Sequence, residues 1–458
     1  MFPTLLLVAG LASGQAPAGG SPPAPLPIPS VTAPVAPSVP VPLPKTKDAP
    51  GTARIVAKQA TQPPAAEPEV PNVTVQVPED IKSDKEEPAA ETPASRWAFM
   101  RSVQGTWLGV LLDDNKFSVY GWTQMSYNGS TDTNTNLPNA MADRPNEFLL
   151  NQNYLHFERS IDTSKREHQF GFVTETLIGS DYRFTLPRGL WNNQLVSNDG
   201  RPELYGIDVF QMYVQAFLPN IGPRGTKVIA GRFATHCGYE LVQGADTPFV
   251  TRSYLFEYDP FTHTGVWATS QLNDTWSVGH GIATGSDTFF DAPTSRATYL
   301  GKLKWAPPNG RSTAAVNVVI TNPKFIESEA FAQYNFYNLI YTYKINERTS
   351  YLMDAGYAHM KDVPNIGATD WYGIANYLMY TFNDKVTGTL RFEAFEDTDG
   401  VRTGFRGLYS EVTAGVSWKP LPGLILRPSV RWDYNANSEA FDGNRALLTG
   451  VMEAIIRW

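Results

Sequence analysis

The sequence is short of cysteine, of long apolar runs and of excess basic charge, and each shortage excludes a class of protein. Cys237 is the single cysteine among 458 residues, which excludes an intramolecular disulfide framework and a cysteine-ligated zinc site. Apolar runs are too short to cross a bilayer as helices, so any role in a membrane falls to strands. The net charge of −8 argues against a nucleic-acid partner.

Aromatic residues, by contrast, are abundant, and the end of the chain shows how they are used. The 21 Tyr, 24 Phe and 11 Trp favour strands and suit the girdles that barrels place at membrane interfaces. In the stretch 445–458 the two faces of an extended strand separate cleanly. One face carries Leu448, Gly450, Met452, Ala454, Ile456 and Trp458, and the other carries Thr449, Glu453 and Arg457. This pattern is typical of a wall between lipid and water.

The first hundred residues predict three segments that precede the main domain. Residues 1–14 have an apolar core followed by small residues, which indicates a signal peptide and therefore export. Residues 15–95 are rich in proline and alanine and predict a disordered periplasmic linker. Residues 96–113 space their apolar side chains as one short amphipathic helix. That helix is compatible with the membrane surface, with a plug in a lumen, or with packing under a barrel.

From residue 114 to 458 the sequence alternates between polar and apolar residues in about sixteen short segments separated by turn residues. The connections alternate too, because every second one is short and the others, such as 129–147, 236–261 and 360–369, are long. An antiparallel up-and-down transmembrane β-barrel with short periplasmic turns and long outer loops predicts this alternation. The fold class is therefore all-β.

Charged residues in the last four segments fall on the face opposite the lipid-compatible residues, so we expect them to line the lumen. The set consists of Arg391, Glu393, Glu411, Arg427, Arg431, Asp433, Glu453 and Arg457. Two roles are open. The charges can set up a transverse field that filters solutes, or they can pair with one another and hold the wall together.

A second polar cluster lies in FEYDPFTHTG and is interpreted as a loop at the mouth or constriction of the barrel. Its members are Glu257, Asp259, Thr262, His263 and Thr264. A metal site would need three or four converging ligands, and this spacing is weak evidence for one, so no metal and no cofactor are expected. The catalytic motifs G-x-S-x-G, P-loop and H-E-x-x-H do not occur, and no enzymatic activity is expected.

Several stretches also resemble a known family. FQMYVQAFLP, PFTHTG, RFEAFEDTDG and RPSVRWDY are similar to the beta-barrel porin-2 (OmpL-like) family of outer-membrane porins, in its planctomycete form. The resemblance implies a porin in the outer membrane of a Gram-negative-type cell, passing small hydrophilic solutes by passive diffusion. It carries no catalytic residues. The expected partners are outer-membrane lipid, the barrel-assembly machinery, the cell wall through the N-terminal linker, and two further copies in a homotrimer.

Two alternatives remain open at this point. The first is a structural or adhesive outer-membrane barrel with a plugged lumen, which differs from a porin in having no conductance. The second is a secreted all-β carbohydrate-binding protein or enzyme, which would purify without detergent.

Deletion of Trp458 should block insertion into the outer membrane. An aromatic residue at the end of an alternating strand resembles the signal that the barrel-assembly machinery reads, and it anchors the strand at the interface. The measurement is the amount of protein in purified outer membranes, and a truncated chain present at the wild-type level would contradict this role of Trp458.

Overall fold

The computed structural model describes residues 97–197, 200–290, 296–324 and 331–458. The signal peptide and linker predicted for residues 1–95 lie outside this range. Sixteen strands follow two short helices. The strands are β1 Phe117–Ser130, β2 Glu147–Arg159, β3 Gln169–Gly179, β4 Gly206–Leu218, β5 Thr226–Ala234, β6 Thr262–Gln271, β7 Trp276–Ser286, β8 Thr298–Trp305, β9 Ser312–Thr321, β10 Gln333–Lys344, β11 Thr349–Val363, β12 Gly367–Asn383, β13 Val386–Asp397, β14 Gly407–Leu421, β15 Leu424–Asn435 and β16 Ala446–Arg457.

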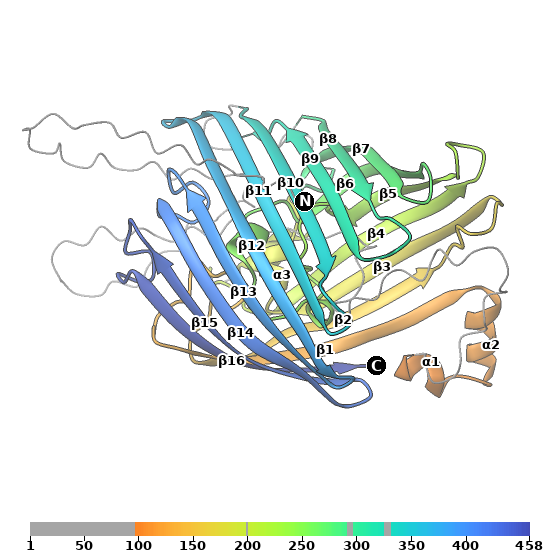
Figure 1. Cartoon of the computed structure of the whole chain (residues 1–458), viewed down its shortest axis with the longest axis horizontal. Helices are drawn as coiled ribbons and strands as arrows, with labels where there is room; N and C mark the ends of the chain where they lie inside the picture. Colours follow the sequence, from red (N-terminus) through yellow and green to blue (C-terminus); the bar gives the residue numbers. More distant parts are fainter. Residues whose placement is uncertain (1–96, 198–199, 291–295, 325–330) are drawn as a thin grey trace, which may run out of the picture. The chain divides into compact units, whose positions relative to one another are not determined.

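Each strand pairs antiparallel with its neighbours in sequence, and β16 returns to pair with β1, so the sheet closes into a barrel (Figure 1). The strand number and topology predicted from the sequence are confirmed. Within the described ranges, no helix is both long enough and apolar enough to cross a membrane. Closure leaves no strand with an unpaired edge, which is the condition for a sheet to cross a bilayer.

The two faces of the sheet divide the side chains by polarity. On β16 the outward Leu448, Met452 and Ile456 are 45%, 56% and 47% exposed, whereas the inward Thr449 and Glu453 are buried. The same division continues on the neighbouring strands, because paired residues share a face. The barrel therefore presents an apolar surface to lipid and a polar surface to its interior.

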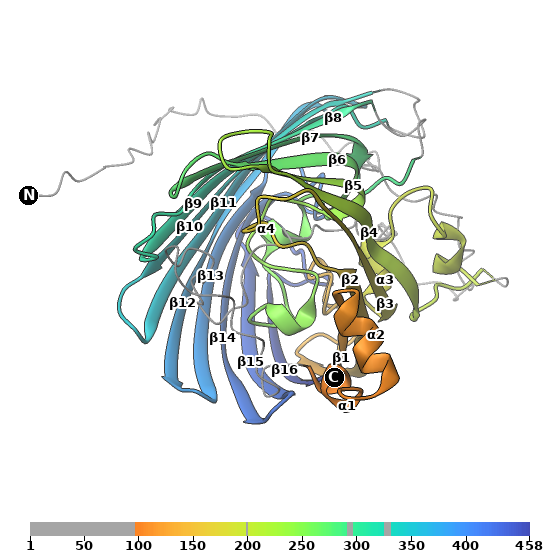
Figure 2. The same cartoon turned by 90° about the vertical axis from the view of Figure 1, so that its right-hand side faces the viewer.

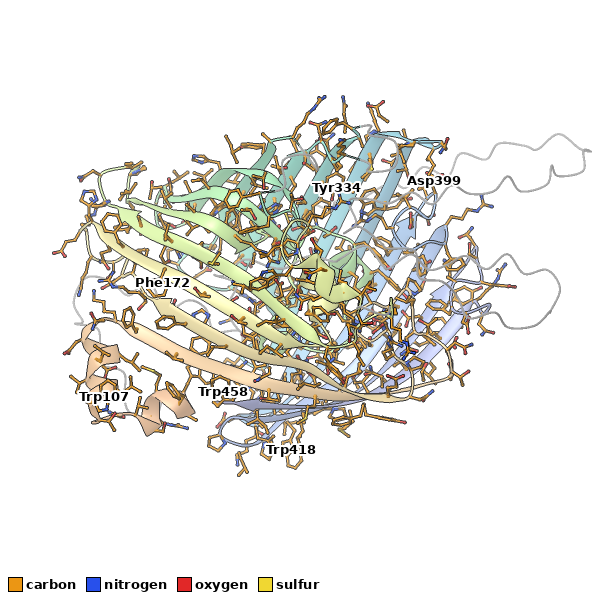
Figure 3. All side chains as sticks on the ribbon, turned by 180° about the vertical axis from the view of Figure 1, so that it is seen from behind. Trp107, Phe172, Tyr334, Asp399, Trp418 and Trp458 are labelled. Atoms are coloured by element: carbon orange, nitrogen blue, oxygen red, sulfur yellow. The ribbon has the colours of Figure 1, made fainter. Side chains whose placement is uncertain are left out.

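The connections differ in length at the two ends of the barrel, as expected from the sequence, with one exception. The predicted long connection 360–369 is wrong, because β11 and β12 continue pairing as far as Val363 opposite Gly367. Asn365 and Gly367 both have positive φ and make a tight turn between the two strands. In Figure 3, Asp399 in a long connection lies at the opposite end from Trp418 and Trp458, which lie at the short-turn end.

The predicted single helix 96–113 is divided into α1 Ala98–Ser102 and α2 Trp107–Asp114. Gly105 has a φ of 77° and breaks the helix, and Thr106 then caps α2 by accepting a hydrogen bond from the N–H of Gly109. The remaining helices are short and lie in loops: α3 Tyr182–Thr185, η1 Asn192–Leu195, η2 Gly244–Asp246 and α4 Tyr254–Glu257.

The first described residue lies against the inner face of the barrel at the short-turn end. The Trp97 ring stacks on Tyr120 with 5.6 Å between centroids, and Tyr120 stacks on His156 at 4.3 Å. The Arg457 guanidinium lies 5.1 Å from the centroid of the Trp97 ring. These contacts fix the start of α1 beside the seam between β1 and β16.

The end of the chain completes this seam. Trp458 donates its N–H to the Gly121 carbonyl at 2.9 Å, and Gly121 donates its N–H to the Trp458 carbonyl at 3.0 Å. A Cβ at Gly121 would collide with the Tyr154 carbonyl oxygen and would lie 2.7 Å from the Trp458 indole. The indole therefore covers a position where only glycine fits.

Replacing Gly121 with valine should prevent closure of the barrel, because overpacking costs about 1–3 kcal/mol or more where the backbone cannot move away. The matched control is Gly450→Val on the facing strand of the same seam, where an added Cβ meets nothing within 4 Å. Unboiled electrophoresis in SDS should show the compact barrel for Gly450→Val and not for Gly121→Val. Equal compact fractions for the two variants would contradict this account of the seam.

Candidate functional site

The connection between β5 and β6, residues 235–261, folds into the barrel. Figure 2 shows α4, which belongs to this loop, inside the ring of strands. Every residue of the loop is buried except Asp246. A loop buried to this extent needs partners for its backbone polar groups, and these come from the charged inner wall.

Arg391 on β13 joins the wall to the loop. Its guanidinium contacts the Glu240 carboxylate of the loop at 2.7 Å and the Glu411 carboxylate of β14 at 3.0 Å. It also donates a hydrogen bond of 3.1 Å to the carbonyl of Thr251. All three charged side chains are fully buried. A buried arginine between two carboxylates is a fixed structural element, because each charge depends on the other two.

The remaining arginines of the wall bind loop carbonyls in the same way. Arg427 contacts Glu453 at 2.7 Å through Nε, and donates to Gly244 at 2.6 Å and to Thr247. Since these carbonyls have no strand partner, the guanidinium groups supply hydrogen bonds that the loop backbone would otherwise lack.

Arg431 and Arg457 complete the set on β15 and β16. Arg431 contacts Asp433 at 2.8 Å and donates to the carbonyl of Arg252. Arg457 donates to the carbonyl of Ala245 and pairs with the Asp246 carboxylate. The arginines thus bind the loop from Gly244 to Arg252 along its length.

The carboxylates of the wall bind the start of α4. Glu393 accepts the N–H groups of Tyr254 and Leu255, both at 2.7 Å. Asp433 accepts the Tyr254 hydroxyl at 2.7 Å. Charged acceptors make stronger hydrogen bonds than neutral ones, and here they orient the short helix toward β13 and β15.

The wall formed by β2 and β3 holds the loop through neutral and acidic groups that the sequence reasoning missed. Gln152 donates to the Val242 carbonyl at 2.7 Å and accepts the Gly244 N–H at 3.0 Å. Gln243 donates to Glu175 at 3.0 Å.

Farther round the barrel, Asn338 accepts the Gly238 N–H at 3.1 Å and Asp354 accepts the Tyr239 N–H at 2.7 Å. All four of the missed wall residues, Gln152, Glu175, Asn338 and Asp354, occupy inward positions on β2, β3, β10 and β11. That inward position was the only sequence signal available for them.

Glu257 joins this loop to the connection between β1 and β2. Its carboxylate accepts the N–H of Ala140 at 2.9 Å and that of Met141 at 3.4 Å. Burial raises the pKa of Glu257 to about 8, while the Arg431 charge and the two N–H groups act in the lowering direction. Arg402, from a third connection, donates to the Tyr258 carbonyl at 2.6 Å.

The other members of the predicted loop cluster lie in different surroundings. Thr262, His263 and Thr264 are the first residues of β6, so their assignment to the loop is wrong. His263 contacts Thr235 at 3.0 Å and the Gly285 carbonyl at 3.2 Å. Asp259 is in the loop and buried. In the described ranges, no three His, Cys, Asp or Glu side chains are grouped so that they could hold a metal ion.

The eight charged residues predicted for the lumen all lie on the inner faces of β13 to β16. Seven of them are buried, and they form one chain of contacts with the loop. A closed barrel with an apolar outer face, a charged inner face and a connection folded inside is the architecture of an outer-membrane β-barrel channel.

The comparisons with known proteins agree. The model of the family "Putative beta-barrel porin-2, OmpL-like" matches residues 116–457, and the chain belongs to this family of outer-membrane porins. No match is found among curated proteins.

Two solved structures share the fold at low sequence identity. The outer membrane channel DcaP of Acinetobacter baumannii is 11% identical, with a TM-score of 0.50 over 75% of this chain and 97% of that one. OprB of Pseudomonas putida, in its high pH structure, is 10% identical, with a TM-score of 0.51 over 81% of this chain and 100% of that one.

Replacing Arg391 with alanine should destabilise the folded barrel strongly, since it leaves Glu240 and Glu411 buried without their shared partner. The expected cost is about 3–5 kcal/mol. The midpoint of guanidinium unfolding, followed by tryptophan fluorescence, measures it. The control is Lys385→Ala in the exposed turn between β12 and β13, which should leave the midpoint unchanged. A wild-type midpoint for Arg391→Ala would show that the network adds no stability.

Proposed function

We propose that the chain is a channel for passive diffusion of small hydrophilic solutes, and that loop 235–261 determines how much of the lumen is open. The observation that carries the proposal is the anchoring of this loop to the inner wall by Arg391, Arg427, Arg431 and Glu393. The wall charges act mainly as anchors for the loop. A loop inside a barrel of this strand number limits a lumen that would otherwise be wide.

A barrel with a plugged lumen is the second candidate. The burial of every residue of 235–261 except Asp246 favours it, because a loop that borders an open passage presents side chains to water. The two candidates differ in one measurable property, since a plugged barrel conducts only when the loop is removed.

The proposed cellular setting is the outer membrane, reached after export by the signal peptide of residues 1–14. The position of Trp97 at the short-turn end supports a periplasmic origin for the linker that precedes it. Assembly by the barrel-assembly machinery through Trp458, contact of the linker with the cell wall, and a homotrimer stay predictions. The mass of the purified complex in detergent tests the last of these.

Conductance in planar bilayers tests the proposal. The wild-type chain should conduct, and a variant in which residues 241–252 are replaced by a short Gly-Ser linker should conduct several-fold more. Solute uptake by liposomes should follow the same order, with a pentose entering faster than a tetrasaccharide.

Three results distinguish the candidates. Conductance in both proteins, larger in the shortened variant, supports the channel. Conductance only in the shortened variant supports the plugged barrel. A shortened variant that folds, as judged by its compact form in unboiled SDS electrophoresis, and still does not conduct would contradict both.

A further inference from the structure

The inner wall at the short-turn end of the barrel carries a strong excess of positive charge. Within five residues of the short turns, the inward positions hold four lysines that are at least partly exposed, besides Arg427 and Arg457, which are paired with Glu453 and Asp246. The four are Lys227, Lys304, Lys344 and Lys419. The inward acidic side chains of the strands in the same zone are Glu158 and Glu453. This excess contrasts with the net charge of −8 for the whole chain.

The pairing register shows that these lysines face inward. Lys227 lies opposite Phe217, which is buried, and Lys304 lies opposite the buried Ala315. Directly paired residues share a face, so both lysines point into the barrel. Lys344 has the same parity along β10 as the buried Asn338.

Lys419 has the same parity along β14 as the buried Glu411 and Thr413. It therefore faces the interior of the barrel as well. It is exposed, whereas Lys304 and Lys344 are partly exposed. The charged ends of these side chains are therefore within reach of water.

The carboxylates of this zone have other partners. Asp246 is committed to Arg457, Glu453 is committed to Arg427, and Glu158 lies 3.6 Å from His156. Within the described ranges, the ammonium groups of Lys304, Lys344 and Lys419 form no ion pair. A concave surface lined by charges of one sign focuses its field and concentrates the opposite ion.

We propose that this vestibule, defined by Lys227, Lys304, Lys344 and Lys419, binds small anions and makes the channel anion-selective. The expected ligands carry carboxylate, sulfonate or phosphate groups, because lysine attracts such groups as a mobile point charge without demanding one geometry. Rings of basic side chains act in this way in anion pores. The selectivity rests on the proposed channel function, whereas binding in the vestibule does not.

The zero-current potential in a KCl gradient tests the selectivity. The wild-type channel should show the sign expected when chloride is more permeant than potassium. The triple variant Lys304→Glu, Lys344→Glu, Lys419→Glu should show the opposite sign. The matched control Lys165→Glu, Lys361→Glu, Lys385→Glu makes the same change of charge at exposed positions outside the vestibule and should keep the wild-type sign. Raising the ionic strength should reduce the potential by screening.

A second measurement tests anion binding without recording a current. Binding of pyrenetetrasulfonate to the folded protein in detergent, followed by dye fluorescence anisotropy, should be lost in the vestibule variant and retained in the control. Conductance with cation selectivity in the wild type would overturn the inference and leave the proposed channel intact. If neither the wild type nor the loop-shortened protein conducts, the proposed channel function is wrong, and dye binding alone tests the anion site. Equal dye binding by the vestibule variant and the control would then overturn the anion site.

Discussion

Every backbone N–H and C=O group that crosses a bilayer must be paired within the protein, and the rest of this structure depends on that constraint. It forces the sheet to close, so Trp458 pairs with Gly121 where the last strand meets the first. Closure separates an outer face from an inner one. Since lipid excludes charge from the outer face, Arg391, Arg427 and Arg431 are directed inward, where they need partners.

The partners come from loop 235–261, whose backbone groups need hydrogen-bond partners in turn. Its backbone is buried without a strand to pair with, and the guanidinium and carboxylate groups of the wall satisfy it. The wall thus supplies hydrogen-bond partners to the loop backbone, and the loop supplies partners to the wall charges. Few of the wall charges near the loop therefore remain available to solutes. The basic residues near the short turns differ, since Lys304, Lys344 and Lys419 lie beyond the loop anchors and reach water. The lumen therefore combines a structural zone of paired charge with a vestibule in which basic side chains outnumber acidic ones.

The sequence predicted the features of this arrangement that depend on local sequence pattern. The period of two along β13 to β16 placed Arg391 and Glu393 on the inner face, and the turn residues marked sixteen strands. Local pattern does not specify partners, however. Glu393 and Tyr254 are 139 positions apart, and only the closed barrel brings them together. For the same reason the choice between a filter and a pairing role for the arginines needed the structure. Gly105 and the turn at Asn365 and Gly367 show the smaller errors, since positive φ angles broke a helix and shortened a loop.

The central claim is that the charged wall holds loop 235–261 fixed inside the barrel, and hydrogen exchange measures this most directly. The amides of Tyr239, Tyr254 and Leu255 donate to buried carboxylates of the wall. In the folded protein they should exchange as slowly as the ladder amides of β13 and β14. Exchange of these three amides as fast as that of the exposed turn residue Asp384 would show that the loop is not held, and would contradict the account.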